Sequence, residues 1–277
     1  MAAAFTLTMA YLAENYGSAE ISSALAAYIT GVVTSNLVGR LMSAAVADLF
    51  GLGVNFYMLA GLNLAGALLV LLSLDGGQPV PSHTQIRSPL ATWAEHLRNP
   101  ALLSGFGLGF LILFAFIGIF TCVNFVLTDP PIGLGSMSLG LVYFVFLPSM
   151  MTTPLAGRVA AGFGLRETLW ASLGVAAAGL PLLLVPTLSP VLAGMVLVGV
   201  GTFFAQAIGT GFIGRAAMGD RAAASGLYLA SCYLGGLAGA AILGQVFNHL
   251  GWTATVAGVA VTLALGALLA FRMRLEK

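Results

Sequence analysis

Apolar segments long enough to cross a lipid bilayer recur along almost the whole chain. A membrane-spanning helix needs roughly 20 apolar residues, and runs of that length are separated here only by Gly, Pro and short polar stretches. Only 7% of the residues are charged, compared with about a quarter in an average soluble domain. The alternating pattern of barrel strands is absent. The sequence therefore predicts an all-α, polytopic membrane protein.

Nine membrane-spanning helices are expected from the apolar runs and from the residues that interrupt them. Pro148 and Pro154 in the fifth of these runs, and Pro181 in the sixth, predict kinks or breaks. The expected helices cover residues 2–16, 22–49, 53–74, 101–127, 137–157, 168–186, 189–213, 222–248 and 252–272.

A polar linker, residues 75–100, divides the helices into an incomplete first half (1–74) and a six-helix second half (101–277). The linker contains a short amphipathic helix, expected to lie on the membrane surface. Its apolar face carries Leu90, Trp93, Ala94 and Leu97, and its polar face carries Glu95, His96 and Arg98. Asn99 and Pro100 then predict the N-cap and first turn of the next spanning helix.

The basic residues predict the orientation in the membrane. When nine helices are threaded through the bilayer, every basic residue except Arg40 falls on the same side of the membrane. The positive-inside rule makes that side cytoplasmic. The linker and the C-terminus are therefore expected in the cytoplasm, and the protein in the cell membrane. The residues on this side are Arg87, Arg98, Arg158, Arg166, Arg215, Arg221, Arg272, Arg274 and Lys277.

An internal repeat is indicated when the sequence is shifted by 200 residues. Residues 24–51 then lie over residues 224–251 without a gap, with Gly51 opposite Gly251. Parallel repeats are a known plan of transporters. By this repeat, the counterparts of three second-half helices fall before Met1, so we expect an N-terminally truncated chain that does not transport alone.

The chain resembles the major facilitator superfamily (MFS), whose members have two six-helix halves, a cytoplasmic linker and basic cytoplasmic loops. The resemblance implies a bundle in which this chain supplies helices four to twelve of twelve. The family's cytoplasmic loop motif corresponds to "GRVAAGFGLRE", residues 157–167. Ala161 and Gly162 replace the motif's Asp-Arg pair, so the gating role of that pair is not expected. The loop residues carried over are Gly157, Arg158, Gly164 and Arg166.

Residues 24–51 are similar to the fifth helix of the drug efflux branch related to acriflavin-sensitivity transporters. The resemblance implies proton-coupled efflux of small amphipathic compounds by alternating access, carried out by a monomer. Two alternatives stay open: proton-coupled uptake of an anionic metabolite, and a non-transporting relic or membrane scaffold.

Arg40 is the strongest single candidate for a site residue. A mid-membrane arginine costs on the order of 2.5–3.5 kcal/mol and usually faces a cavity or a partner. No acidic residue of the chain falls at its expected depth. Arg40 therefore either binds an anionic group or tunes a carboxylate in the transport path, with Asn36 one turn away on the same face, or it forms a structural salt bridge or carbonyl clamp between helices.

Three further intramembrane residues are candidates for the substrate or proton path: Asn124, Gln206 and Phe203. The resemblance places them on helices seven and ten, which line the central cavity of that fold. The alternative for each is simple helix packing. Two series of small residues predict close helix packing: Ser35, Gly39 and Ser43, and the matching Ser231, Gly235 and Gly239.

Signatures of enzymes and metal sites are missing from the sequence. Cys122 and Cys232 lie in separate apolar runs without metal-ligand spacing, and no motif of a hydrolase or a phosphate loop is found. The expected protein is not an enzyme, has no cofactor or metal, and does not bind nucleic acid.

Overall fold

The computed structural model describes residues 21–73, 89–217 and 220–273, apart from a few side chains chiefly near the start of the first helix. The regular elements of these residues are all helices. Six of the helices are long and apolar enough to cross a membrane. The prediction of a polytopic helical membrane protein is confirmed. The count of nine spans is not, because the expected helix 2–16 lies outside the described residues.

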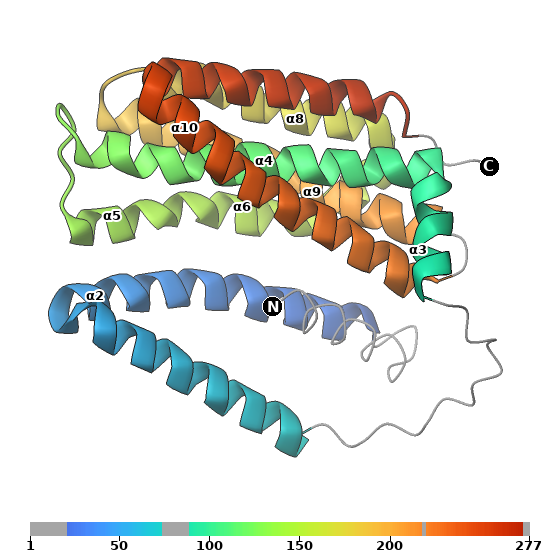
Figure 1. Ribbon diagram of the computed structural model, residues 1–277, viewed down its shortest axis with the longest axis horizontal. Coiled ribbons are helices and arrows are strands. Elements are labelled where there is room, and N and C mark those ends of the chain that lie inside the picture. The colour runs from blue at the N-terminus through green and yellow to red at the C-terminus, as the bar shows by residue number, and fades with distance from the viewer. Residues whose placement is uncertain (1–20, 74–88, 218–219, 274–277) are drawn as a thin grey trace.

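Two of the helices are hairpins that turn at a glycine (Figure 1). Helix α2 (Ile21–Ser73) turns at Gly51, with φ 86° and ψ 165°. Helix α10 (Arg221–Ala270) turns at Gly251, with φ 81° and ψ −176°. This backbone conformation is essentially restricted to glycine. The turns fall between the helices expected at 22–49 and 53–74, and at 222–248 and 252–272.

The second half forms one packed bundle. At its centre lies α4 (Pro100–Thr128), crossed by the first arm of α10 (Figure 1). Helices α8 (Leu165–Leu183) and α9 (Leu188–Ala216) pack against each other on the far side. The prediction for the start of α4 is confirmed, since the Asn99 side chain accepts hydrogen bonds from the backbone N–H groups of Ala101 and Leu102 at 2.9 and 3.3 Å.

The span expected at residues 137–157 is broken into short pieces. Pro148 stands in the first turn of α6, and Pro154 lies within the 3-10 turn η2. Proline lacks the N–H that continues a helix, which accounts for breaks at these two positions. The pieces are α5 (Ser136–Val142), η1 (Tyr143–Phe146), α6 (Leu147–Thr152), η2 (Thr153–Leu155) and α7 (Ala156–Phe163).

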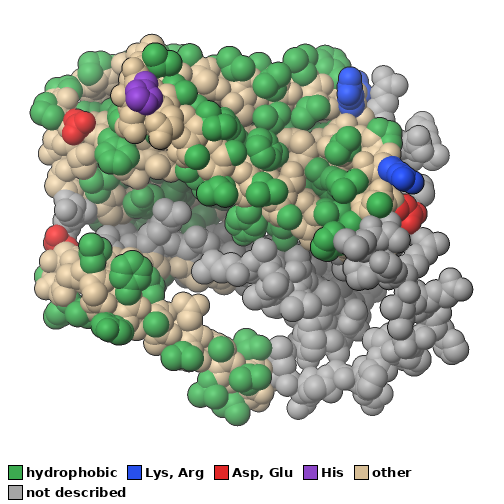
Figure 2. Space-filling view, in the orientation of Figure 1, with side chains coloured by type: hydrophobic (Ala, Val, Ile, Leu, Met, Phe, Trp, Pro, Cys, Tyr) green, Lys and Arg blue, Asp and Glu red, His purple; other side chains and the backbone are tan. Residues whose placement is uncertain are grey.

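Apolar side chains cover the outside of the bundle as well as its core (Figure 2). The first arm of α2 runs beside α5, whereas the second arm lies farther from the bundle (Figure 1). Leu71 and Leu72 on that second arm are 77% and 79% exposed. Such exposure is costly in water but not in a bilayer, which fits a membrane environment.

Basic side chains gather at the end of the bundle that carries α3 (Pro89–Arg98) (Figure 2). Arg98, Arg215 and Arg272 line one pocket at this end, and Arg166 donates a hydrogen bond to the carbonyl of Phe271 beside it at 3.0 Å. Arg98, Arg166, Arg215 and Arg272 therefore share one end, as the positive-inside analysis predicted, and the side of the membrane that this end faces stays a prediction.

The polar face predicted for the linker helix needs one correction. His96 was expected at the solvent-facing surface, but its side chain is only 4% exposed. Its Nε2 lies 3.0 Å from the backbone oxygen of Asp220, the N-cap residue of α10. Trp93 and Leu97 are 45% and 49% exposed instead, because α3 packs its histidine side against the bundle.

Candidate functional site

An aromatic cluster lies between α4, η1 and α9 in the interior of the bundle. We define it by Phe116, Phe120, Tyr143, Phe146 and Phe203. The ring of Phe203 meets Phe116 edge-on, with centroids 5.0 Å apart, and Phe146 at 6.1 Å. Phe120 and Phe146 lie 4.8 Å apart. These are the separations of interacting aromatic pairs, so three elements distant in sequence are joined here.

Phe203 is the member of the aromatic cluster that the sequence had singled out. It is half-buried, as are Phe116 and Tyr143, whereas Phe120 and Phe146 are buried. The cluster therefore has a packed side and a more accessible side. Phe116, Phe120, Tyr143 and Phe146 were missed, because aromatic residues in a membrane helix carry no sequence signal that separates a cavity wall from a lipid-facing surface.

Asn124 adds a polar group to this cluster. Its side-chain amide donates to the backbone oxygen of Phe120, one turn earlier, at 3.0 Å and to the hydroxyl of Tyr143 at 3.4 Å. The second contact joins α4 to η1. Asn124 and Phe203 are thus brought to one place, with an amide and a phenol beside four phenyl rings.

Gln206 lies one turn after Phe203 on α9. Its backbone oxygen accepts a hydrogen bond from the Thr210 hydroxyl at 2.9 Å and one from the Tyr228 hydroxyl at 3.4 Å. Tyr228 is only 1% exposed. The Gln206 side chain itself is half-buried, and its place in a transport path stays a prediction.

Arg40 and Asn36 lie on the first arm of α2, but their side chains are outside the described part of the structure, so their roles stay predictions. Nearby, the Asn55 amide donates to the Ser43 hydroxyl at 2.8 Å and joins the two arms of α2. Asn55 is only 6% exposed, although most of its arm is open to the outside. The sequence analysis did not single out this contact.

The two series of small residues differ in their surroundings. On α10, Ser231 donates to the backbone oxygen of Phe106 at 2.8 Å. A Cβ added at Gly235 or Gly239 would collide with the backbone of Phe110 or Phe114. The backbones of α10 and α4 therefore approach closely at every fourth residue of this series, as small residues permit. At Gly39 of the other series, an added Cβ would meet nothing within 4 Å, and a packing role there stays a prediction.

The loop motif joins α7 to α8, and Gly164 forms the turn with φ 97°. Arg166 follows in the first turn of α8, where its guanidinium carbon lies 5.9 Å from the Trp170 ring centre and 5.8 Å from that of Phe271. With its hydrogen bond to the Phe271 carbonyl, Arg166 ties this loop to the end of α10. Gly157 and Arg158 lie on α7 and are exposed.

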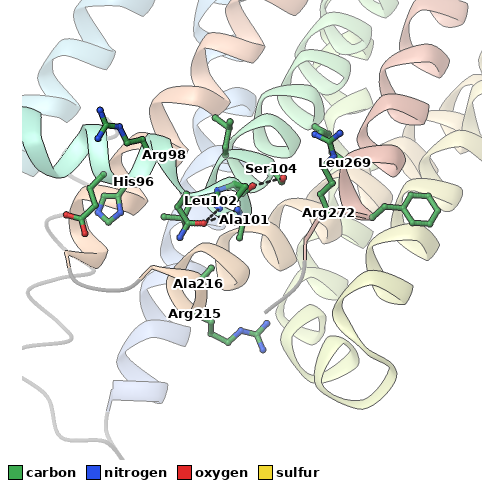
Figure 3. Close-up of a pocket in the computed structure, with 14 residues that line it drawn as sticks. His96, Arg98, Ala101, Leu102, Ser104, Arg215, Ala216, Leu269 and Arg272 are labelled. Atoms are coloured by element: carbon green, nitrogen blue, oxygen red, sulfur yellow. Dashed lines mark hydrogen bonds between the residues drawn. The ribbon is translucent and has the colours of Figure 1, made fainter. Parts of the chain in front are cut away.

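A pocket of about 1320 Å³ opens at the end of the bundle between α3, α4, α9 and α10 (Figure 3). Its lining combines charged residues with apolar ones, among them Leu103 and Phe271. This pocket lies apart from the aromatic cluster, and the sequence analysis did not predict it.

In the described part of the chain, no group of three or more His, Cys, Asp or Glu side chains is placed to hold a metal ion. Cys122 and Cys232 are buried and free. The fold and this site define a polytopic helical membrane protein with an aromatic cluster, Asn124 and the Tyr143 hydroxyl inside its bundle.

Comparisons with known proteins narrow this class. No family model matches the chain. It is 24% identical over 97% of its length to an "Uncharacterized transporter" of Buchnera aphidicola subsp. Schizaphis graminum, of which it covers 65%. It is 27% identical over 96% of its length to the inner membrane transport protein YnfM of Escherichia coli, of which it covers 64%. To the uncharacterized MFS-type transporter YybF of Bacillus subtilis it is 24% identical over 91% of its length, covering 62% of that protein.

One of these relatives is named as a transporter of MFS type. The relatives are named as transporters and not as enzymes, and one is named as an inner membrane protein. The chain spans about two thirds of the length of these curated relatives.

Proposed function

We propose that the chain takes part in secondary active transport of a small molecule by alternating access, with proton-coupled efflux of amphipathic compounds as the activity. The observation that carries this proposal is the aromatic cluster with Asn124 at its edge. It joins α4, η1 and α9 inside the bundle, and we take it as the place where the substrate binds.

The chemistry of the aromatic cluster suits an amphipathic ligand, above all a lipophilic cation. Aromatic faces attract cations through the ring quadrupole by roughly 0.5–2 kcal/mol each. Small-molecule sites are mostly apolar, with a few polar groups that fix orientation, and the Asn124 amide and Tyr143 hydroxyl are such groups. Phe116, Tyr143 and Phe203 are the half-buried members that a ligand would reach first.

Arg40 favours a second candidate, proton-coupled uptake of an anionic metabolite. An arginine inside a membrane helix is costly unless it has a cavity or a partner. An anionic substrate would supply that partner, with Asn36 as a second polar contact. The two candidates differ in the charge of the ligand, which an experiment can separate.

The test is equilibrium binding of a fluorescent lipophilic cation and of a matched organic anion to the purified chain in neutral detergent. We expect the cation to bind, and Phe203→Ala to weaken its binding roughly tenfold, the loss of one good aromatic contact. Phe163→Ala is the control, since Phe163 is 78% exposed on α7. Preferred binding of the anion, abolished by Arg40→Ala, would favour uptake, and binding of neither ligand would favour a non-transporting protein.

A cellular assay tests the direction of transport and the coupling. In cells that express the gene from its own locus, we expect Phe203→Ala to raise dye accumulation relative to the Phe163→Ala control. Collapse of the proton gradient should remove the difference between wild type and Phe203→Ala. Equal accumulation in the presence of the gradient would contradict efflux.

A further inference from the structure

Three arginines from three different elements surround the pocket at the α3 end. Arg98 comes from α3, Arg215 from the last turn of α9, and Arg272 from the segment directly after α10. Figure 3 shows them well separated around the pocket. Among the described residues of the lining, Glu95 is the one carboxylate, so their positive charges outnumber the negative one.

These guanidinium groups have hydrogen-bonding capacity to spare. In the part of the chain that the structure describes, none of the three forms an ion pair with a carboxylate. Toward the described residues, Arg215 donates from Nε to the backbone oxygen of Gly211 at 3.2 Å. The Asn99 side chain already caps the N-terminus of α4, so a ligand would be held by the arginines and not by that helix end.

Apolar side chains stand directly beside these charges. Leu103 and Phe271 line the same pocket and are 52% and 51% exposed. On neighbouring α3, Trp93 and Leu97 are exposed as well. Tryptophan is enriched at the membrane–water interface, so the exposed Trp93 places this end of the bundle at the level of the lipid headgroups. The pocket therefore offers cationic and apolar contacts at the depth where a phospholipid presents its phosphate and the start of its acyl chains.

We propose that this pocket binds the headgroup of an anionic phospholipid. Arginine recognises phosphate oxygens through paired N–H donors, and basic pockets between membrane helices bind such headgroups. A free phosphate ion would fill little of a 1320 Å³ pocket and would not use Leu103 or Phe271. The inference requires only that the bundle is embedded in a membrane, and it does not depend on the transported substrate.

The test is a titration of the purified 277-residue chain with cardiolipin, phosphatidylcholine or inorganic phosphate in neutral detergent, with the bound species counted by native mass spectrometry. An arginine near an anionic lipid contributes on the order of fivefold in affinity. The combined variant Arg98→Gln, Arg215→Gln and Arg272→Gln should therefore bind cardiolipin about a hundredfold more weakly than the wild type. Arg158→Gln, which removes an arginine of the same end outside the pocket, should bind cardiolipin normally.

Several results would overturn the proposal. They are unchanged cardiolipin binding by the triple variant, an equal loss in Arg158→Gln, equal binding of phosphatidylcholine, or displacement of cardiolipin by inorganic phosphate at similar concentration. Circular dichroism shows whether the triple variant folds. If it does not fold, the cardiolipin affinities of the three single variants are compared instead. Each is expected to bind about fivefold more weakly than the wild type, and unchanged affinity in all three would contradict the proposal.

Discussion

Trp170 and Trp252 join α8 and the second arm of α10 reciprocally, one at each end of the pair. The indole N–H of Trp170, near the start of α8, donates to the Ala267 carbonyl at 3.0 Å. The indole N–H of Trp252, directly after the Gly251 turn, donates to the Leu183 carbonyl at 2.8 Å. The last carbonyls of a helix lack intrahelical partners. Each tryptophan therefore donates a hydrogen bond to a carbonyl in the last turn of the other helix.

We expect Trp170→Phe and Trp252→Phe each to lower the stability of the bundle. Phenylalanine keeps most of the apolar contact but loses the hydrogen bond, and interhelical hydrogen bonds in membrane proteins contribute about 0.6–1.7 kcal/mol. Because the two bonds lie at opposite ends, their effects should add in the double variant. Thermal unfolding followed by circular dichroism measures this. Trp93→Phe is the control, since Trp93 is 45% exposed, and an equal loss there would contradict the prediction.

Gly235→Ala and Gly239→Ala should disrupt the contact between α10 and α4. The added methyl group would collide with the backbone of Phe110 or Phe114, and a helix backbone cannot yield as a side chain does. We expect a loss of about 1–3 kcal/mol for each change, the usual cost of overpacking. Gly244→Ala is the matched control on the same helix, because its added methyl group meets nothing within 4 Å. Equal melting temperatures for Gly235→Ala and Gly244→Ala would show that the helices are not in close contact.

Substitution of the glycines at the two helix turns is expected to lower stability through backbone strain. Gly51→Ala and Gly251→Ala place a Cβ at φ 86° and 81°, where a non-glycine residue costs on the order of 1–3 kcal/mol. Apart from the adjacent residues and the local helix backbone, no atom lies within 4 Å of the added Cβ at either position. Any loss of stability is therefore due to the backbone conformation and not to crowding by neighbouring elements. Gly53→Ala, two residues away in a helix, should be neutral or slightly stabilising. A lower melting temperature for Gly51→Ala than for Gly53→Ala would support the prediction. Identical thermal unfolding curves of the two variants would contradict it.

Much of this architecture could be predicted from the sequence, because it depends on local properties. The length of each apolar run predicts a span, and the 200-residue repeat paired Gly51 with Gly251, which have nearly the same φ and ψ. Asn99 and Pro100 predicted the start of α4, because capping depends on adjacent residues only. Pro148 and Pro154 predicted the breaks before and after α6 for the same reason.

The contacts between helices could not be predicted in this way. The reciprocal tryptophan bonds and the meeting of Phe116 with Phe203 depend on which helix faces are joined, and no local pattern records that choice. His96 illustrates the same limit. The amphipathic pattern of residues 90–98 placed it on the polar side, and in soluble surroundings that side faces water. Here the polar side of α3 meets a backbone carbonyl at the end of the bundle instead.

The His96 contact leads to a prediction about local docking. His96→Ala removes the hydrogen bond between α3 and the Asp220 carbonyl, a loss of about 0.5–1.5 kcal/mol for an ordinary hydrogen bond. Because α3 has few other buried side chains among those described, this loss should appear as local opening and not as global unfolding. We expect hydrogen exchange of residues 89–98 to become roughly threefold to tenfold faster, with exchange in α4 unchanged. His249→Ala, an exposed histidine at the opposite end of the bundle, should leave both regions unchanged. Unchanged exchange of residues 89–98 in His96→Ala would mean that the arginine and apolar contacts, and not this hydrogen bond, hold α3 against the bundle.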